Sequence, residues 1–380
     1  MKSFKSTLCV FTLISGIAIS PLIAQRQSGK LNKIQQYMDK ATSNNLVGVS
    51  VYIKSPKLGK WIGTSGYSNL EEKEPLKRND IFGLASIGKM YVAVSALKLV
   101  EEGKLNLDDK IQGYLPKEII EGFATANDVT IKHLLGHTSG LYNYNRNPEL
   151  NELYLTGNLK LDTLSHIEAL RKYAYGITGH TKPLGEYKYS STNYLLLSMV
   201  MDSVIQYDHA EFIREEIIRK YNLRDTYYKQ TPPKRLVDHY GDIDLNNITE
   251  NLSEETIETT NWYSGDDGVY SSIEEASNFL QRLMKGEILS ENTLKEMMKW
   301  NDEKKPDYGL GLMADKAFPY RFLMGHSGRG IGVTTDLYYF PHQDMTIAIF
   351  CNSGLRSASK EYAKTYHRMR NRIIKKLFLF

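Results

Sequence analysis

The sequence contains the tetrapeptide Ser-x-x-Lys, in which a serine hydroxyl could act as a nucleophile and a lysine amine as its base. Residues three apart on a helix lie on the same face, so the two groups would be neighbours. A lysine that is partly desolvated and near cations or dipoles can have its pKa lowered enough to accept the serine proton. The tetrapeptide occurs three times, beginning at Ser86, Ser95 and Ser357. At least two of the three therefore have another role.

The surroundings of the three serines favour Ser86 with Lys89. We expect a long helix from about residue 86 to about residue 102. Ser86 lies at its start, where free backbone N–H groups and the helix dipole can stabilise an oxyanion. Ser95 lies in the middle of the same helix among apolar neighbours, which indicates packing, and Ser357 lies in the polar entry to the last helix. Ser86 and Lys89 are therefore the candidate pair.

Two further segments carry groups that such a nucleophile needs. Tyr189 precedes an expected helix, and a phenol at a cleft could accept or return a proton. Aromatic packing is the alternative in a chain with 26 tyrosines. His326-Ser327-Gly328 follows an expected strand over residues 320–324, where small glycines would let a substrate backbone pair as an added strand. A simple turn is the alternative for this segment.

Strand-like patterns lie at both ends of the chain and helical patterns in the middle. The sequence predicts an α+β fold with an antiparallel five-stranded sheet, flanked by helices, and an inserted all-helical lobe. One flanking helix begins with the capping box Ser272 to Glu275. We expect residues 29–104 and 255–380 to form the sheet domain and residues 105–254 the lobe, with the active site between them. The five expected strands are residues 46–54, 60–67, 320–324, 332–340 and 345–351.

Composition narrows the class of protein. The chain has 380 residues, of which 41% are hydrophobic and 24% charged, and this excludes collagen-like, disordered and polytopic membrane proteins. The length suggests two domains, or one large domain with an insertion. Lysine and arginine total 48 against 44 for aspartate and glutamate. The resulting net charge of +4 gives no sign of a nucleic-acid partner.

The first residues have the layout of a secretory signal peptide. Two lysines precede an apolar run over residues 8–19, which is too short to cross a bilayer, and the small Ala24 precedes a polar segment. Residues 1–24 therefore predict an exported protein, periplasmic or extracellular, with an uncleaved anchor or a buried helix as the alternative. Cys9 lies at the start of the run, which does not fit a lipoprotein. Cleavage would leave only Cys351, so no internal disulfide is expected.

Three other patterns help to narrow the function. His133 and His137 have helical spacing that could hold a metal, but no glutamate lies between them, so we expect hydrogen bonds within a loop and no metal. The last helix is basic before residues 377–380. It could rest on an anionic membrane surface, but a helix packed on the sheet with a solvated basic face is the simpler interpretation. No Gly-x-Ser-x-Gly elbow occurs, which excludes an α/β-hydrolase.

Taken together, the motifs resemble those of the serine β-lactamase and penicillin-binding-protein superfamily. Ser86-x-x-Lys89, Tyr189-Ser190-Ser191 and His326-Ser327-Gly328 follow one another in the order of that superfamily. Within it, the chain is similar to the class C-like branch, which holds D-alanyl-D-alanine carboxypeptidases, D-aminopeptidases and β-lactamase-fold esterases. The resemblance implies a β-lactamase/transpeptidase-like fold. It extends over about residues 31–354 and includes residues 131–141, 265–272 and 308–311.

The resemblance also implies a role for each motif residue. Ser86 would be the acylated nucleophile and Lys89 its base, while Tyr189 would assist proton transfer to the leaving group or from the deacylating water. The backbone N–H groups of Ser86 and Arg329 would form the oxyanion hole. Substrate would be bound by four residues, namely Ser191, His326, Ser327 and Gly328.

Two positions depart from the family pattern. Ser191 stands where an asparagine amide usually binds the substrate's carbonyl and steadies the lysine, and Asn193, two residues later, cannot be assumed to replace it. His326 stands where β-lactamases usually have lysine, and a mostly neutral imidazole is a weaker anchor for a carboxylate. Both changes argue against an efficient β-lactamase.

We therefore expect an exported serine hydrolase that forms an acyl-enzyme on Ser86 and acts on a small amide, peptide or ester. A D-amino-acid peptide of the cell wall, such as a peptidoglycan stem peptide, would suit a DD-carboxypeptidase-like enzyme. Two alternatives stay open: a penicillin- or muropeptide-binding protein of the same fold with little turnover, and a β-lactamase-fold esterase. No cofactor is expected.

Overall fold

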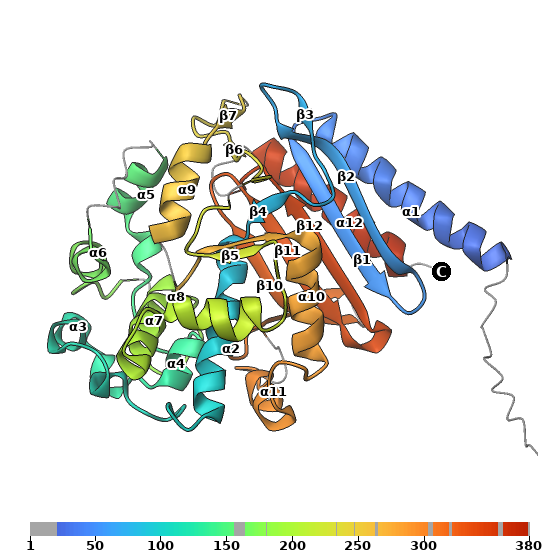
Figure 1. Cartoon of the computed structure of the whole chain (residues 1–380). Helices are drawn as coiled ribbons and strands as arrows, with labels where there is room; N and C mark the ends of the chain where they lie inside the picture. Colours follow the sequence, from blue (N-terminus) through green and yellow to red (C-terminus); the bar gives the residue numbers. More distant parts are fainter. Residues whose placement is uncertain are drawn as a thin grey trace, which may run out of the picture.

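The computed structural model describes residues 21–155, 164–179, 181–232, 234–246, 248–262, 265–302, 307–318, 321–355 and 360–378. Its largest element is a seven-stranded antiparallel sheet in the order β3-β2-β1-β12-β11-β10-β9 (Figure 1). The strands of this sheet are β1 (Gly48–Ser55), β2 (Gly59–Asn69), β3 (Glu74–Pro75), β9 (Met313–Phe318), β10 (Arg321–Arg329), β11 (Thr334–Phe340) and β12 (Met345–Cys351). The helices are α1 (Pro21–Thr42), α2 (Gly88–Glu101), α3 (Lys117–Gly122), α4 (Ile131–Leu135), α5 (Pro148–Leu155), α6 (His166–Tyr173), α7 (Ser191–Ile205), α8 (His209–Ile213), α9 (Ser253–Trp262), α10 (Ile273–Met284), α11 (Glu291–Met297) and α12 (Lys360–Phe378).

The sheet is wider than the sequence predicts, so the expectation of five strands is wrong. The five expected strands are present, and β3 and β9 add one strand at each edge. β3 has two residues, too few to show an alternating pattern, and Asp315 followed by Lys316 interrupts any alternation in β9. β10 continues beyond the expected end at Met324 to Arg329. The His326-Ser327-Gly328 motif therefore lies within a strand and not in a turn.

Strand β1 joins the two ends of the chain in one sheet. Val51 is paired with Gly63 of β2 on one side and with Ile349 of β12 on the other. Helices α1 and α12 cover one face of this sheet, and α10 packs on the other (Figure 1). Successive residues of β1 face the two layers, since Val51 packs in the cluster with α1 and α12 and Tyr52 in the larger core.

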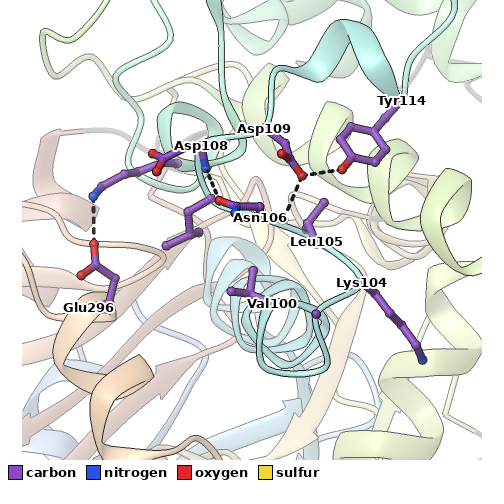
Figure 2. A pocket seen from close by; sticks show the side chains of 11 residues that line it. Val100, Lys104, Leu105, Asn106, Asp108, Asp109, Tyr114 and Glu296 are labelled. Carbon is purple, nitrogen blue, oxygen red and sulfur yellow. Dashed lines mark hydrogen bonds and ion pairs between the residues drawn. The ribbon is translucent and has the colours of Figure 1, made fainter.

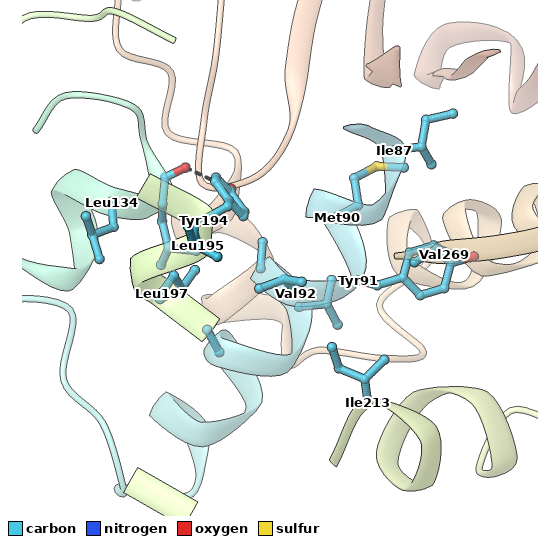
Figure 3. Close-up of a cluster of buried hydrophobic side chains, with 14 of the residues drawn as sticks. Ile87, Met90, Tyr91, Val92, Leu134, Tyr194, Leu195, Leu197, Ile213 and Val269 are labelled. Atoms are coloured by element: carbon cyan, nitrogen blue, oxygen red, sulfur yellow. Dashed lines mark hydrogen bonds between the residues drawn. The ribbon is translucent and has the colours of Figure 1, made fainter. Parts of the chain in front are cut away.

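Helix α2 is enclosed by other elements along most of its length. Every residue from Gly88 to Leu99 is buried, as expected of a helix that is apolar all round. Figure 3 shows its side chains among those of α7 and α8, including Tyr194 and Ile213. A single 3-10 turn, η1 (Ala85–Ile87), leads directly into it. Packing on all sides therefore fixes the position of the residues at the start of α2.

The lobe expected to be all-helical contains three short strands, which corrects that part of the prediction. β5 (Thr226–Tyr228) pairs with β8 (Val269–Ser272), and β6 (Tyr240–Gly241) pairs with β7 (Glu250–Asn251). Strands of two or three residues leave no periodic pattern in a sequence. β8 also pairs with β4 (Ile81–Gly83). This small sheet therefore brings the segment before Ser86 beside the segment that follows Asp266.

The ends of the chain bear on the expectation of export. Residues 1–20 of the expected signal peptide lie outside the described residues, and residues 21–24 form the first residues of α1. Among the helices in the described ranges, none is both long enough and apolar enough to cross a membrane. Cys351 is buried with a free thiol. Export stays a prediction.

Candidate active site

Ser86 lies in η1, between β4 and α2, next to Lys89. The residue before it, Ala85, has a left-handed backbone with a φ of 48°, a conformation that costs energy for a side chain with a Cβ atom. Lys89 is fully buried, and its Nζ donates a hydrogen bond to Ser86 Oγ at 3.1 Å. The structure therefore brings together the candidate nucleophile and the candidate base.

The surroundings of Lys89 favour its protonated form. Nζ donates to the backbone oxygen of Asp266 at 2.7 Å and lies 3.8 Å from the Oδ2 atom of the same residue. Burial acts to lower the pKa of Lys89, but its electrostatic interactions with Tyr189 and Asp266 outweigh burial, so the pKa lies above its usual value. This direction is opposite to the lowered pKa that the sequence predicts, because the buried Asp266 was not part of that prediction.

Tyr189 lies beside this pair, just before α7. The ring centroid of Tyr189 is 5.3 Å from Lys89 Nζ, and its ring packs against His137 with centroids 4.2 Å apart. His137 Nδ1 accepts a hydrogen bond from the backbone N–H of Ser190 at 3.3 Å. His133 instead caps the start of α4 through Thr130. The two histidines therefore make separate structural hydrogen bonds, and His137 holds the Tyr189 segment in place.

His326 is a residue of β10, and its side chain is fully buried. Its Nε2 lies 3.0 Å from the hydroxyl of Tyr308, and its Nδ1 lies 2.7 Å from the backbone oxygen of Ser327. The carbonyl can only accept, so Nδ1 carries the proton and Nε2 accepts from Tyr308. Burial, with the charges of Lys89 and Arg329, lowers the pKa of His326 to about 3. The imidazole is therefore neutral at neutral pH and holds no charge for a substrate carboxylate.

Gly328 allows β10 to approach η1 closely. A Cβ atom on Gly328 would lie 2.3 Å from the backbone oxygen of Leu84 and 3.0 Å from Cβ of Ala85. Thr335, the partner of Gly328 in β11, donates to the same Leu84 oxygen at 2.9 Å. The backbone segments of Ser86 and Arg329, expected to form the oxyanion hole, are thus neighbours.

One edge of β10 is open where the third motif lies. β9 pairs with β10 only as far as Gly325, opposite Met313. From His326 to Arg329, no strand of the described residues pairs with that edge, although β11 pairs with the other. An extended substrate could add to the open edge as a strand.

A cavity of about 720 Å³ joins these elements. Five of the predicted site residues line it, namely Ser86, Tyr189, Ser191, Ser327 and Arg329. Two other predicted residues, His326 and Gly328, are not among its lining residues. Sequence reasoning missed other lining residues and the buried Asp266. Several of them follow directly after residues 131–141, a stretch that already resembles the superfamily, and this was the available signal. The missed lining residues are Asn143, Asn145, Arg146, Asn151, Tyr187 and Met313.

A second cavity of similar size, about 730 Å³, lies at the end of α2 (Figure 2). Most of its charged groups are already engaged: Lys132 pairs with Glu296, Lys104 pairs with Glu102, and Asp109 accepts from Tyr114. Ser86 and Lys89 do not line it. The cavity beside Ser86 is therefore the candidate active site.

Comparisons with known proteins identify the family and the fold of the chain. Penicillin-binding protein 4* of Bacillus subtilis (strain 168) is 29% identical over 301 residues, which are 74% of this chain and 63% of that protein. This chain thus spans less than two thirds of that relative's length. The solved structure of a D-stereospecific amidohydrolase from Streptomyces sp. has a TM-score of 0.75 at 23% identity, over 85% of this chain and 94% of that one. For D-amino acid amidase from Ochrobactrum anthropi SV3 the TM-score is 0.76 at 20% identity, over 92% and 98% of the two chains.

The family model described as Beta-lactamase matches residues 32–369. The match spans nearly all of the described chain, and the solved structures share its fold. The resemblance to the serine β-lactamase and penicillin-binding-protein superfamily is confirmed at the level of the family. This chain belongs to the Beta-lactamase family.

Proposed function

We propose that the protein is a serine hydrolase that forms an acyl-enzyme on Ser86 and cleaves an amide or ester bond. The observation that carries this proposal is the 3.1 Å hydrogen bond between Lys89 Nζ and Ser86 Oγ, where Ser86 lines a cavity of about 720 Å³. A buried lysine in contact with a serine at the start of a helix is one arrangement that can activate a serine for nucleophilic catalysis.

Lys89 and Tyr189 would act as a coupled pair. The raised pKa of Lys89 means that the pair must first lose a proton before it can serve as a base. The pair then takes the proton of Ser86 as Oγ attacks the substrate's carbonyl carbon. The oxyanion would be held by the backbone N–H groups of Ser86 and Arg329. When the C–N or C–O bond breaks, the pair returns the proton to the leaving group, and water then hydrolyses the acyl-enzyme.

The charges of the cavity support a substrate with a carboxylate. Among the described residues that line it, none carries a carboxylate, whereas two carry guanidinium groups. Arg329 is paired with Asp336, whereas Arg146 forms no ion pair with any described residue. With His326 neutral, Arg146 is the group suited to a substrate's terminal carboxylate. A D-amino-acid peptide of the cell wall, cleaved in the manner of a DD-carboxypeptidase outside the cytoplasm, has such a group.

The names of the structural neighbours support D-amino-acid chemistry. Two of them are a D-stereospecific amidohydrolase and a D-amino acid amidase, and the curated relative is a penicillin-binding protein. Ser191, in place of the usual asparagine, favours a second candidate: a protein of the same fold that binds penicillin or muropeptides with little turnover. An esterase is the third candidate, since one structural neighbour is a hydrolase with acyltransferase activity.

Mass spectrometry after incubation with a fluorophosphonate or a penicillin tests the nucleophile. We expect an adduct on Ser86 that is absent from Ser86→Ala, and no adduct with either reagent would overturn the proposal. A panel of D-Ala-D-Ala peptides, D-amino-acid amides and p-nitrophenyl esters then identifies the substrate. A penicillin adduct that never clears, without hydrolysis of any panel member, would favour the binding protein.

A further inference from the structure

Asn143 lies against the residue that replaces the usual asparagine of the second motif. Its Oδ1 accepts a hydrogen bond from the backbone N–H of Ser191 at 3.2 Å. Ser191 is the first residue of α7, and both Asn143 and Ser191 line the cavity with Ser86. A side-chain amide is therefore present beside position 191, although it comes from another part of the chain.

The orientation of this amide follows from its partners. Oδ1 also accepts from the backbone N–H of Asn145 at 3.2 Å, so that Asn143 caps the 3-10 turn η4 (Tyr144–Arg146). Because both partners are N–H donors, only the oxygen of the amide can face them. The Nδ2 group is thus on the opposite side of the amide, and it donates to no described residue. It remains available as a hydrogen-bond donor in the cavity wall.

The backbone around Asn143 is held firmly to α7. The hydroxyl of Thr192 donates to the backbone oxygen of Tyr142 at 2.6 Å and accepts from the backbone N–H of Tyr144 at 3.1 Å. Thr192 is fully buried. These bonds fix the residues on both sides of Asn143, so its amide is positioned before substrate binds, which lowers the entropic cost of binding.

We propose that Asn143 Nδ2 binds a carbonyl oxygen on the acyl side of the substrate, and that the site therefore takes N-acylated D-amino-acid substrates in preference to those with a free α-amine. This inference rests on the proposed function. An ammonium group is bound best by a carboxylate, but none of the described residues that line the cavity carries one, and Oδ1 of Asn143 already accepts two hydrogen bonds. The available donors, Asn143 and Arg146, instead suit carbonyl and carboxylate oxygens.

The test compares two substrates that differ only at the amine, D-alanine p-nitroanilide and N-acetyl-D-alanine p-nitroanilide. We expect the wild-type protein to hydrolyse the acetylated substrate with the higher kcat/KM. Asn143→Asp keeps the size and the acceptor oxygen that the two backbone N–H groups need, but it removes the donor. It should lower kcat/KM for the acetylated substrate about tenfold or more, as expected for one lost hydrogen bond and an added repulsion, and should lower it less for the free-amine substrate, whose ammonium group the new carboxylate attracts.

Two control variants test whether the effect comes from the amide of Asn143, and one labelling measurement separates this inference from the proposed function. Ser191→Asn, added to Asn143→Asp, restores the usual amide and should regain part of the activity on the acetylated substrate. Asn44→Asp makes the same chemical change at an exposed site and should have no effect. Fluorophosphonate labelling of Ser86, which involves no acyl-side carbonyl, should be similar in the wild type and Asn143→Asp.

The outcomes are distinguishable. No labelling of the wild type would overturn the proposed function itself. With labelling intact, an equal loss on both substrates, or no loss on either, would overturn the role of Asn143. A wild-type preference for the free amine would also overturn the inference, and this measurement needs no variant and no assumption that Asn143→Asp folds.

Discussion

The Nζ atom of Lys89 lies 3.8 Å from Oδ2 of Asp266, and both side chains are buried, at 0% and 4% exposed. Oδ2 also accepts from Asn145, but Oδ1 of Asp266 is buried without a hydrogen-bond partner among the described residues. A buried carboxylate that is only partly satisfied is costly, and such groups cluster at functional sites because they adjust the pKa of a neighbour. Asp266 is therefore suited to hold the proton on Lys89 in the resting site.

Asp266→Asn should move the pH dependence of hydrolysis. Lys89 must lose its proton before the pair can accept one from Ser86, so kcat/KM rises with pH through the pKa of Lys89. This pKa is raised in part by Asp266, and removing the negative charge lowers it. The acid limb of the profile for a p-nitrophenyl ester should therefore shift to lower pH by about 1–3 units.

Asp108→Asn is the matched control for this measurement. Asp108 is an exposed carboxylate at the second cavity, so the same substitution should leave the profile unchanged. An Asp266→Asn profile that coincides with the wild type, or a limb that moves to higher pH, would contradict the role of Asp266 as the counter-ion of Lys89.

The main strands of the fold could be predicted because each carries a long apolar or alternating run. The short strands could not, since pairing with distant residues defines them. β5, for example, has three residues and is a strand because Thr226 pairs with Ser271 of β8. The sequence predicts the third motif after its strand for a related reason: glycines at 325 and 328 are typical of a turn, but pairing with β11 extends β10 through them.

The motif residues of the site could be predicted, but their electrostatics could not. Ser86, Lys89 and Tyr189 come together as the order of motifs indicates. The sequence predicts a lowered pKa for Lys89 because it reveals burial but not the carboxylate of Asp266, which lies 177 residues further along the chain. Asn143 likewise could not be predicted as a site residue, because its role follows from its hydrogen bond with the backbone N–H of Ser191.

Gly328→Ala should remove much of the activity without unfolding the protein. A Cβ atom would lie 2.3 Å from the backbone oxygen of Leu84 and would push β10 away from η1. The backbone N–H groups of Ser86 and Arg329 would then no longer converge on one oxyanion. We expect kcat for an ester to fall on the order of 10²–10³-fold. Gly113→Ala, at a glycine with open space around it, is the control. Equal activity of the two variants would argue against this oxyanion hole.

Buried histidines should make the protein sensitive to acid. Burial lowers the pKa of His239 to about 4, against about 6.5 in the unfolded chain. Between these values only the unfolded chain binds the proton, so the stability is fully present above about pH 6.5 and is lost as the pH falls toward 4. At about pH 5 the loss from this one residue is about 2 kcal/mol.

Urea unfolding of His239→Gln at about pH 7 and about pH 5 measures this effect. The difference in the free energy of unfolding between the two pH values should be about 2 kcal/mol smaller than in the wild type. His342→Gln, which replaces an exposed histidine, should keep the wild-type difference. An unchanged difference in His239→Gln would contradict the assignment.

Asp336→Asn should destabilise the contact between the sheet and α12. Asp336 is 1% exposed, and its Oδ1 pairs with Arg329 at 2.7 Å. Its Oδ2 accepts hydrogen bonds from two residues of α12, Tyr366 at 2.8 Å and Arg370 at 2.7 Å. Loss of the charge would leave two partly buried guanidinium groups without a counter-ion. The free energy of unfolding in urea should therefore fall by about 3–5 kcal/mol.

Asp128→Asn is the control for this prediction, because the pair of Asp128 with Lys110 is exposed to water and should contribute little. Fluorophosphonate labelling of folded Asp336→Asn should still occur at Ser86, since the substitution alters the side-chain partner of Arg329 and not its backbone N–H. If Asp336→Asn were as stable as Asp128→Asn, the buried network would not hold α12 to the sheet. If it were stable but unlabelled, the network would act on the site itself.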